Sequence, residues 1–186
     1  LIQWLRDKLN IINNASEIEN LARQVDDNGG ITFIPALSGL GAPYWDLYSR
    51  GAIFGLTRDS GRDPIIQATL ESLAYQTKDV IDAMEEDSNI KINSLKVDGG
   101  ACMNNYLMQF QSDILNCEVT RPKIVESTAM GAGYLAGLKS DIWDINKIKS
   151  NQEIDITFSP QIKDERRNIL YDGWRDAVKR TFNWIK

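Results

Sequence analysis

The sequence predicts a mixed α/β domain in which helices pack on a sheet. Short segments with strand character alternate along the chain with segments whose apolar residues recur at helical spacing. One of the helical segments, residues 63–86, is long enough to cross a whole domain. In addition, residues 95–115 show a strand, a glycine turn and a helix in that order.

The N-terminal residues predict two helices followed by a strand. Apolar residues at helical spacing mark a first amphipathic helix over residues 2–12. Ser16 and Glu19 have the spacing of a capping box and predict the start of a second helix. The turn residues at 26–30 end that helix, and residues 31–36 are expected to form a short strand.

Residues 37–50 form a long loop rich in glycine, proline and aromatic residues. Such a loop either contacts a ligand or packs on the protein through its own side chains. Tyr44 and Trp45 favour structural anchoring, although ligand contact stays open. A glycine-bracketed strand is expected at 51–57.

The long helix at 63–86 is expected to be the main buried helix. Asp63 suits its N-cap and Pro64 its first turn. Its apolar residues fall on one stripe: Ile66, Leu70, Leu73, Val80, Ile81 and Met84.

The strand at 90–97 leads into the glycine turn and then into a helix at 104–115. Gly99 and Gly100 carry no Cβ, so the backbone can turn sharply and another group can approach it closely. The N–H groups at the start of the following helix suit a phosphate or another polar ligand group. The pattern therefore indicates either a nucleotide site or an ordinary strand-to-helix turn.

The last third predicts two strands and two helices. Residues 117–120 form a strand that Pro122 closes, and 154–158 form a last short strand. The helix at 127–138 is rich in small residues, which predicts close packing on the sheet. An amphipathic helix is expected at 164–185.

Composition excludes several classes of function. A net charge of −5 without a basic stripe argues against nucleic-acid binding. The absence of histidine from the 186 residues excludes Ser-His and His-metal chemistry within this chain. Two cysteines are too few for a disulfide scaffold and favour a reducing compartment. No apolar run predicts a membrane span, and the uncapped first helix suggests a piece cut from a longer protein.

Six short motifs occur in order along the chain. They are Ser-Gly-Leu-Gly-Ala-Pro-Tyr-Trp-Asp at 38–46, Arg-Gly-Ala-Ile-Phe-Gly-Leu-Thr-Arg at 50–58, Ala-Thr-Leu-Glu-Ser at 68–72, Val-Asp-Gly-Gly-Ala at 97–101, Gln-Phe-Gln-Ser-Asp at 109–113 and Tyr-Asp-Gly-Trp at 171–174. Together these motifs resemble the C-terminal domain of the FGGY family of carbohydrate kinases. The resemblance covers residues 1–186, and the loop at 39–46 is similar to that of the glycerol kinases in this family. Pro64 departs from the pattern, because a polar residue is usual there.

The resemblance implies a ribonuclease-H-like, actin-like ATPase fold with a mixed sheet flanked by helices. This chain would be the nucleotide-binding domain, with an N-terminal domain lying before Leu1. The implied reaction transfers the γ-phosphoryl group of ATP to glycerol, with Mg²⁺, and gives sn-glycerol 3-phosphate and ADP. It also implies a cytoplasmic protein that forms homo-oligomers at full length.

The resemblance carries nucleotide contacts to three positions, Gln3, Gly100 and Asn104, and the glycine turn itself adds Gly99 as a candidate. It supplies no catalytic residue and no metal ligand within this chain, because the general base and the glycerol contacts lie before Leu1. Asp98 is expected to hold the turn rather than to act as a catalyst. The fragment alone is therefore expected to be inactive.

Two other functions remain open from the sequence. The chain could belong to another kinase of the family, such as a xylulose or gluconate kinase. It could also be a non-catalytic nucleotide-binding module of the actin-like superfamily.

Overall fold

The structure is a computed structural model that describes residues 1–150 and 153–186. Its elements along the chain are α1 (Ile2–Asp7), a 3₁₀ helix (Ala15–Glu17), α2 (Ile18–Ala22), β1 (Thr32–Ile34), β2 (Ala52–Phe54), α3 (Arg62–Ser88), β3 (Ser94–Lys96), a second 3₁₀ helix (Gly100–Met103), α4 (Asn105–Leu115), β4 (Glu118–Pro122), α5 (Ser127–Lys139), α6 (Ile145–Ser150), β5 (Ile154–Phe158) and α7 (Asp164–Lys179). Helices thus alternate with short strands, and the predicted α/β class is confirmed.

The strands form two separate sheets. β1 pairs antiparallel with β2, and the order of the second sheet is β3-β4-β5. β3 is parallel to β4, whereas β5 is antiparallel to β4, so this second sheet is mixed. The helix α4 returns the chain from β3 to β4, which is the crossover that a parallel pair requires.

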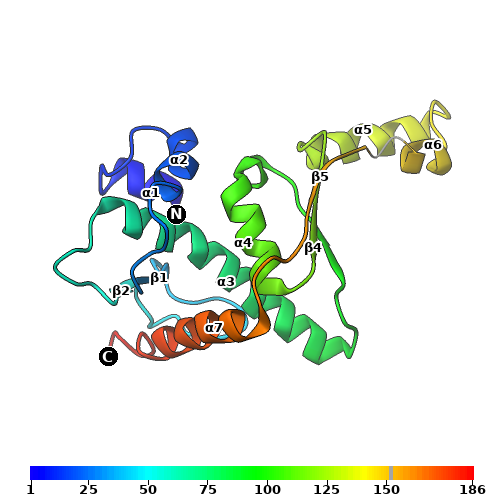
Figure 1. Cartoon of the computed structure of the whole chain (residues 1–186). Coiled ribbons are helices and arrows are strands. Elements are labelled where there is room, and N and C mark those ends of the chain that lie inside the picture. Colours follow the sequence, from blue (N-terminus) through cyan, green and yellow to red (C-terminus); the bar gives the residue numbers. More distant parts are fainter. Residues whose placement is uncertain (151–152) are drawn as a thin grey trace.

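The helix α3 runs through the middle of the molecule, between the N-terminal helices, α4 and α7 (Figure 1). It contributes at least one buried residue to each of the four apolar clusters of the core. These residues are Ile66, Ala68, Leu70, Ala74 and Tyr75. The prediction of a main buried helix is confirmed for this first half, while Val80 and Met84 near its end are exposed.

Both central helices end at an asparagine in the left-handed conformation. Asn89 follows α3 with φ 54°, and Asn116 follows α4 with φ 56°. Asparagine tolerates this conformation better than other non-glycine residues, and it allows a sharp exit from a helix. Each exit turns the chain toward the strand that follows, β3 or β4.

Two predicted helix starts are wrong by one or two residues. The capping interaction lies at Asn14, whose backbone N–H donates to Glu17 Oε1 over 3.3 Å, because a 3₁₀ turn precedes α2. Glu19 instead accepts from the backbone N–H of Asn105 at 3.0 Å, which joins α2 to α4. The N-cap of α3 is Gly61, so Asp63 lies inside the first turn, where its charge still favours the helix.

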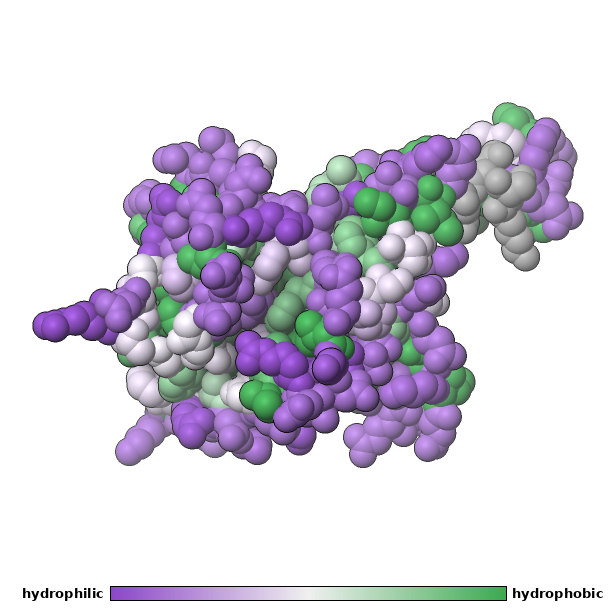
Figure 2. Space-filling model, viewed as in Figure 1, coloured by the Kyte–Doolittle hydropathy of each residue, from purple (hydrophilic) through white to green (hydrophobic). Residues whose placement is uncertain are grey.

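The expected packing of α5 on the sheet is also wrong. Within Ser127–Lys139, only Gly137 is buried, and it lies against the Trp143 ring. Figure 1 shows α5 and α6 extending away from the other elements, and Figure 2 shows hydrophobic residues at the surface of this region. Small residues permit close approach to a neighbour, but the pattern does not identify which part of a polypeptide supplies that neighbour.

Candidate functional site

The turn between β3 and α4 is shaped by its glycines. The backbone of Gly99 adopts φ 75° and ψ 176°, a conformation that a side chain would strain. The Gly99 N–H donates to Val125 O at 2.8 Å, which ties the turn to the segment after β4. A 3₁₀ turn then leads into α4, so the predicted sequence of strand, glycine turn and helix is confirmed.

The outer side of the turn is open at both glycines. A Cβ built on Gly99 or on Gly100 meets no atom within 4 Å among the residues that the structure describes. Unlike Gly99, Gly100 has no positive φ, so its lack of a side chain is not required by the backbone conformation. Open space beside a bare backbone is the arrangement that lets a flat or charged ligand lie against it.

Asn104 caps α4. Its Oδ1 accepts from the Leu107 N–H at 2.9 Å, and its backbone is extended, as is typical of an N-cap. Because Oδ1 is used by the helix, Nδ2 is the part of the amide suited to donate a hydrogen bond to a ligand. The family resemblance assigned Asn104 to a nucleotide and its role as a cap was missed, although an asparagine directly before a helix is a typical N-cap.

Gln3 lies on the exposed side of α1. No hydrogen bond among the described residues joins it to the glycine turn. The two elements are nevertheless neighbours, because Leu5 of α1 and Tyr106 of α4 pack in the same apolar cluster. The structure thus brings Gly99, Gly100 and Asn104 together on one turn, and no hydrogen bond among the described residues joins Gln3 to them.

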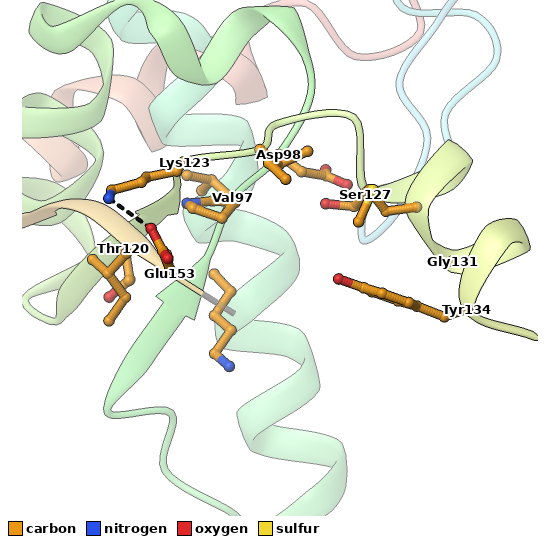
Figure 3. Close-up of a pocket in the computed structure, with 13 residues that line it drawn as sticks. Val97, Asp98, Thr120, Lys123, Ser127, Gly131, Tyr134 and Glu153 are labelled. Atoms are coloured by element: carbon orange, nitrogen blue, oxygen red, sulfur yellow. Dashed lines mark hydrogen bonds and ion pairs between the residues drawn. The ribbon is translucent and has the colours of Figure 1, made fainter. Parts of the chain in front are cut away.

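Two hollows flank the turn. The larger, about 770 Å³, lies between the ends of β3 and β4 and the first turns of α5 (Figure 3), and Asp98 and Ser127 face each other across it. The smaller, about 410 Å³, is lined by Asn105 and Tyr106. Neither hollow is lined by Gly99, Gly100 or Asn104, although their neighbours Asp98 and Asn105 line one hollow each.

The long loop at 37–50 is anchored by its own side chains. Both oxygens of the Asp46 carboxylate accept hydrogen bonds: Oδ1 from the Tyr48 N–H at 2.8 Å, and Oδ2 from Ser49 Oγ at 2.6 Å and from the Asn183 N–H at 2.9 Å. These bonds, led by that of Ser49, hold the pKa of Asp46 below its usual value. The Tyr44 ring packs 5.8 Å from the Phe182 ring. These contacts agree with structural anchoring through Asp46 and Tyr44, whereas the expectation for Trp45 is wrong, because this residue is 76% exposed.

A buried carboxyl beneath the turn was not found from the sequence. Glu71 of α3 is 6% exposed and accepts from Tyr106 Oη at 2.7 Å and from Asn28 Nδ2 at 2.5 Å. Burial raises its pKa from 4.5 to about 7, and the two hydrogen bonds oppose that rise. Its position among the apolar and small residues of α3 is the sequence signal that could have identified it as buried.

Known proteins share this arrangement. The family model described as the FGGY family of carbohydrate kinases, C-terminal domain, matches residues 1–140. The chain belongs to this family. Its fold is therefore the actin-like ATPase fold that the sequence resemblance implied.

Relatives within the FGGY family agree closely in sequence. A glycerol kinase of Caldanaerobacter subterraneus subsp. tengcongensis is 55% identical over 186 residues, which make up 100% of this chain and 37% of that protein. A glycerol kinase of Clostridium botulinum (strain 657 / Type Ba4) is 55% identical over 99% of this chain and 37% of that protein. The chain thus spans little more than a third of the length of these curated relatives.

Solved structures of the FGGY family agree in fold. The crystal structure of Plasmodium falciparum glycerol kinase with ADP matches with a TM-score of 0.89 and 36% identity, over 97% of this chain and 36% of that one. A ligand-bound xylulose kinase from Lactobacillus acidophilus matches with a TM-score of 0.79 and 22% identity, over 97% of this chain and 38% of that one. At 22% identity, the second match shows the fold alone.

Proposed function

We propose that this chain is the nucleotide-binding C-terminal part of a glycerol kinase, which transfers the γ-phosphoryl group of ATP to glycerol and gives sn-glycerol 3-phosphate and ADP. The observation that supports this most is the 55% identity, over the whole chain, to proteins named glycerol kinase. The structurally similar protein with ADP supports a nucleotide as one substrate. The loop at 39–46 favours glycerol over a sugar, because its sequence is similar to that of the glycerol kinases.

The proposed nucleotide contacts are Gly99, Gly100, Asn104 and Gln3. Gly100 offers a bare backbone against which part of the nucleotide lies, and the Asn104 Nδ2 group donates a hydrogen bond to it. Gly99 gives the turn its shape through its positive φ. The contribution of this chain to catalysis is then to hold ATP in a fixed orientation, which is a large part of phosphoryl-transfer catalysis.

Mg²⁺ is expected to accompany ATP, since it neutralises phosphate charge during phosphoryl transfer. Among residues 1–150 and 153–186, no group of three or more acidic or cysteine side chains is arranged to hold a metal ion. No step is assigned to the metal on this chain. We place the general base and the glycerol contacts in the part of the full-length protein outside residues 1–186.

The decisive experiment is an assay of the full-length protein with ATP and Mg²⁺ and with glycerol, xylulose or gluconate as acceptor. We expect ADP release that depends on glycerol and not on the two sugar substrates. Release with xylulose or gluconate instead would favour another kinase of the family. Nucleotide binding without release on any acceptor would favour a non-catalytic actin-like module.

Three further parts of the proposal concern the activity of residues 1–186 alone, the cellular compartment and self-association. Residues 1–186 alone should show no glycerol phosphorylation above background. We propose a cytoplasmic protein, which the free, buried thiols of Cys102 and Cys117 support. We also propose that the full-length protein self-associates. In the described part of the chain, no helix is long and apolar enough to cross a membrane.

A further inference from the structure

Arg121, a buried residue of the mixed sheet, forms hydrogen bonds with the residues that follow the glycine turn. Arg121 lies on β4, in the middle of the mixed sheet, and is 5% exposed. Its Nη1 donates to Cys102 O at 2.8 Å and to Asn105 Oδ1 at 2.9 Å. Its Nε donates to Asp155 Oδ2 at 2.8 Å. The nucleotide site proposed above gives this residue no task of its own.

The two acceptors on the turn lie on either side of Asn104. Cys102 belongs to the 3₁₀ turn that starts at Gly100, and Asn105 is the first residue of α4. One Nη1 group therefore fixes the backbone before Asn104 and the side chain after it. The position of the Asn104 amide relative to Gly100 depends on how these two neighbours are held.

Asp155, the acidic residue that pairs with Arg121, lies where the pairing of β4 and β5 is irregular. The register between β4 and β5 shifts at Arg121, which pairs with Ile156, while Pro122 pairs with Ile154. Asp155 is thus the extra residue of a β-bulge, a device that re-aims a side chain. Its carboxylate comes within 2.7 Å of Arg121 Nη2 and neutralises the buried guanidinium.

This set of hydrogen bonds depends on the planar shape of the Arg121 guanidinium. A buried charge is tolerated only when it is paired and its hydrogen-bonding groups are satisfied. Arg121 meets a carboxylate on one side and two turn acceptors on the other, in the planar fork that only arginine offers. A lysine ammonium carries the same charge, but it cannot reach both groups in one fixed geometry.

We propose that Arg121 is a positioning residue for the nucleotide: through Cys102 and Asn105 it holds Gly100 and Asn104 in the arrangement that binds ATP. This inference rests on the proposed nucleotide site at the turn. It gives Arg121 a role in nucleotide affinity as well as in folding.

The experiment compares two buried arginines in the full-length protein. Arg121→Lys removes the planar guanidinium that donates to Cys102 O and to Asn105 Oδ1. Arg167→Lys is the matched control, because Arg167 is 7% exposed and donates to the backbone oxygens of Asp113 and Ile162, away from the turn. For each variant, the measurements are the Kd for ADP, the KM values for ATP and glycerol, and the thermal midpoint.

We expect both variants to lower the thermal midpoint. Only Arg121→Lys should weaken ADP binding and raise the KM for ATP, by about tenfold, because a small displacement of a binding group costs that much or more. The KM for glycerol should stay within twofold of its original value. In an Asn104→Ala background, the effect of Arg121→Lys on ADP binding should shrink, since the two residues act through one contact.

An unchanged Kd for ADP in folded Arg121→Lys, or equal losses in both arginine variants, would overturn the proposal. If Arg121→Lys does not fold, Asn105→Ala decides, because it removes one acceptor and leaves the ion pair intact. That variant should weaken ADP binding about three- to tenfold, the usual effect of one hydrogen bond, and no change would overturn the proposal.

The Gly100→Val variant separates the two proposals. Weaker ADP binding by Gly100→Val together with normal binding by Arg121→Lys would remove the role of Arg121 and leave the nucleotide site standing. Normal ADP binding by folded Gly100→Val would remove the site, and with it the role of Arg121.

Discussion

Replacement of the buried Glu71 carboxyl by an amide should make the protein less sensitive to rising pH. Burial raises the pKa of Glu71 to about 7 from 4.5. Below pH 4.5 the carboxyl is protonated in both the folded and unfolded states, so its ionisation costs nothing. Between pH 4.5 and 7, the unfolded chain releases the proton while the folded protein retains it, so folding stability falls.

The size of this loss follows from the shift in pKa. A difference of about 2.5 units, at 1.36 kcal/mol for each unit, is about 3 kcal/mol, and the full loss is present above pH 7. Glu71→Gln keeps the shape of the side chain and an oxygen that accepts from Tyr106 or Asn28, but it does not titrate. Relative to this variant, the unmodified protein should lose about 3 kcal/mol of unfolding free energy from pH 4.5 to 8.

The assay is urea unfolding of the full-length protein at intervals between pH 4.5 and 8. Glu86→Gln is the control, because Glu86 lies on the same helix and is exposed. Its stability should follow that of the unmodified protein at every pH. A constant difference between Glu71→Gln and the unmodified protein across this range would refute the account of Glu71 as a buried carboxyl with a raised pKa.

Two further substitutions test the packing around the core. Trp174→Phe removes the indole N–H that donates to buried Asp79 Oδ2 at 2.8 Å. Urea unfolding should show that the variant loses roughly 2–4 kcal/mol of unfolding free energy. A loss under about 0.5 kcal/mol would contradict a stabilising role for this hydrogen bond. Gly55→Ala should destabilise the protein in a thermal melt, because Gly55 has φ 80° and its Cβ would lie 2.2 Å from Gly30 O. Gly131 lies within α5, and a Cβ built on it meets nothing within 4 Å, so Gly131→Ala should leave the midpoint unchanged or raise it slightly. Equal losses in both glycine variants would argue against the backbone explanation.

Much of the architecture follows from local chemistry in the sequence. The strand at 94–96, the glycine turn and α4 were predictable because each depends on neighbouring residues alone: alternation, a missing Cβ and apolar residues at helical spacing. The start of α3 was predicted within two residues for the same reason, since Asp63 and Pro64 suit a first turn.

The remaining features depend on residues far apart in the chain. Glu71 is charged, and only the fold shows that Asn28 and Tyr106 enclose it. Arg121 has no motif around it, and its role emerges only when β5 brings Asp155 beside it. The expectation for α5 failed because small residues indicate how closely a neighbour can approach, but not where that neighbour lies.

The candidate site was predictable in part. Gly99, Gly100 and Asn104 were proposed from the turn and the family resemblance together, and the structure places them on one turn that is open at both glycines. The capping bond of Asn104 narrows its possible contact with a nucleotide to Nδ2. The nucleotide contacts at Gln3, Gly99, Gly100 and Asn104 all stay predictions.

The most direct test of the account is equilibrium binding of ADP to the full-length Gly100→Val variant. A Cβ at Gly100 meets nothing within 4 Å in the described chain, so the variant should fold with an unchanged thermal midpoint. If the nucleotide lies against this backbone, the valine occupies its place, and the Kd should rise at least about a hundredfold, or about 2.7 kcal/mol. An unchanged Kd in the folded variant would contradict the assignment of the glycine turn as the nucleotide site.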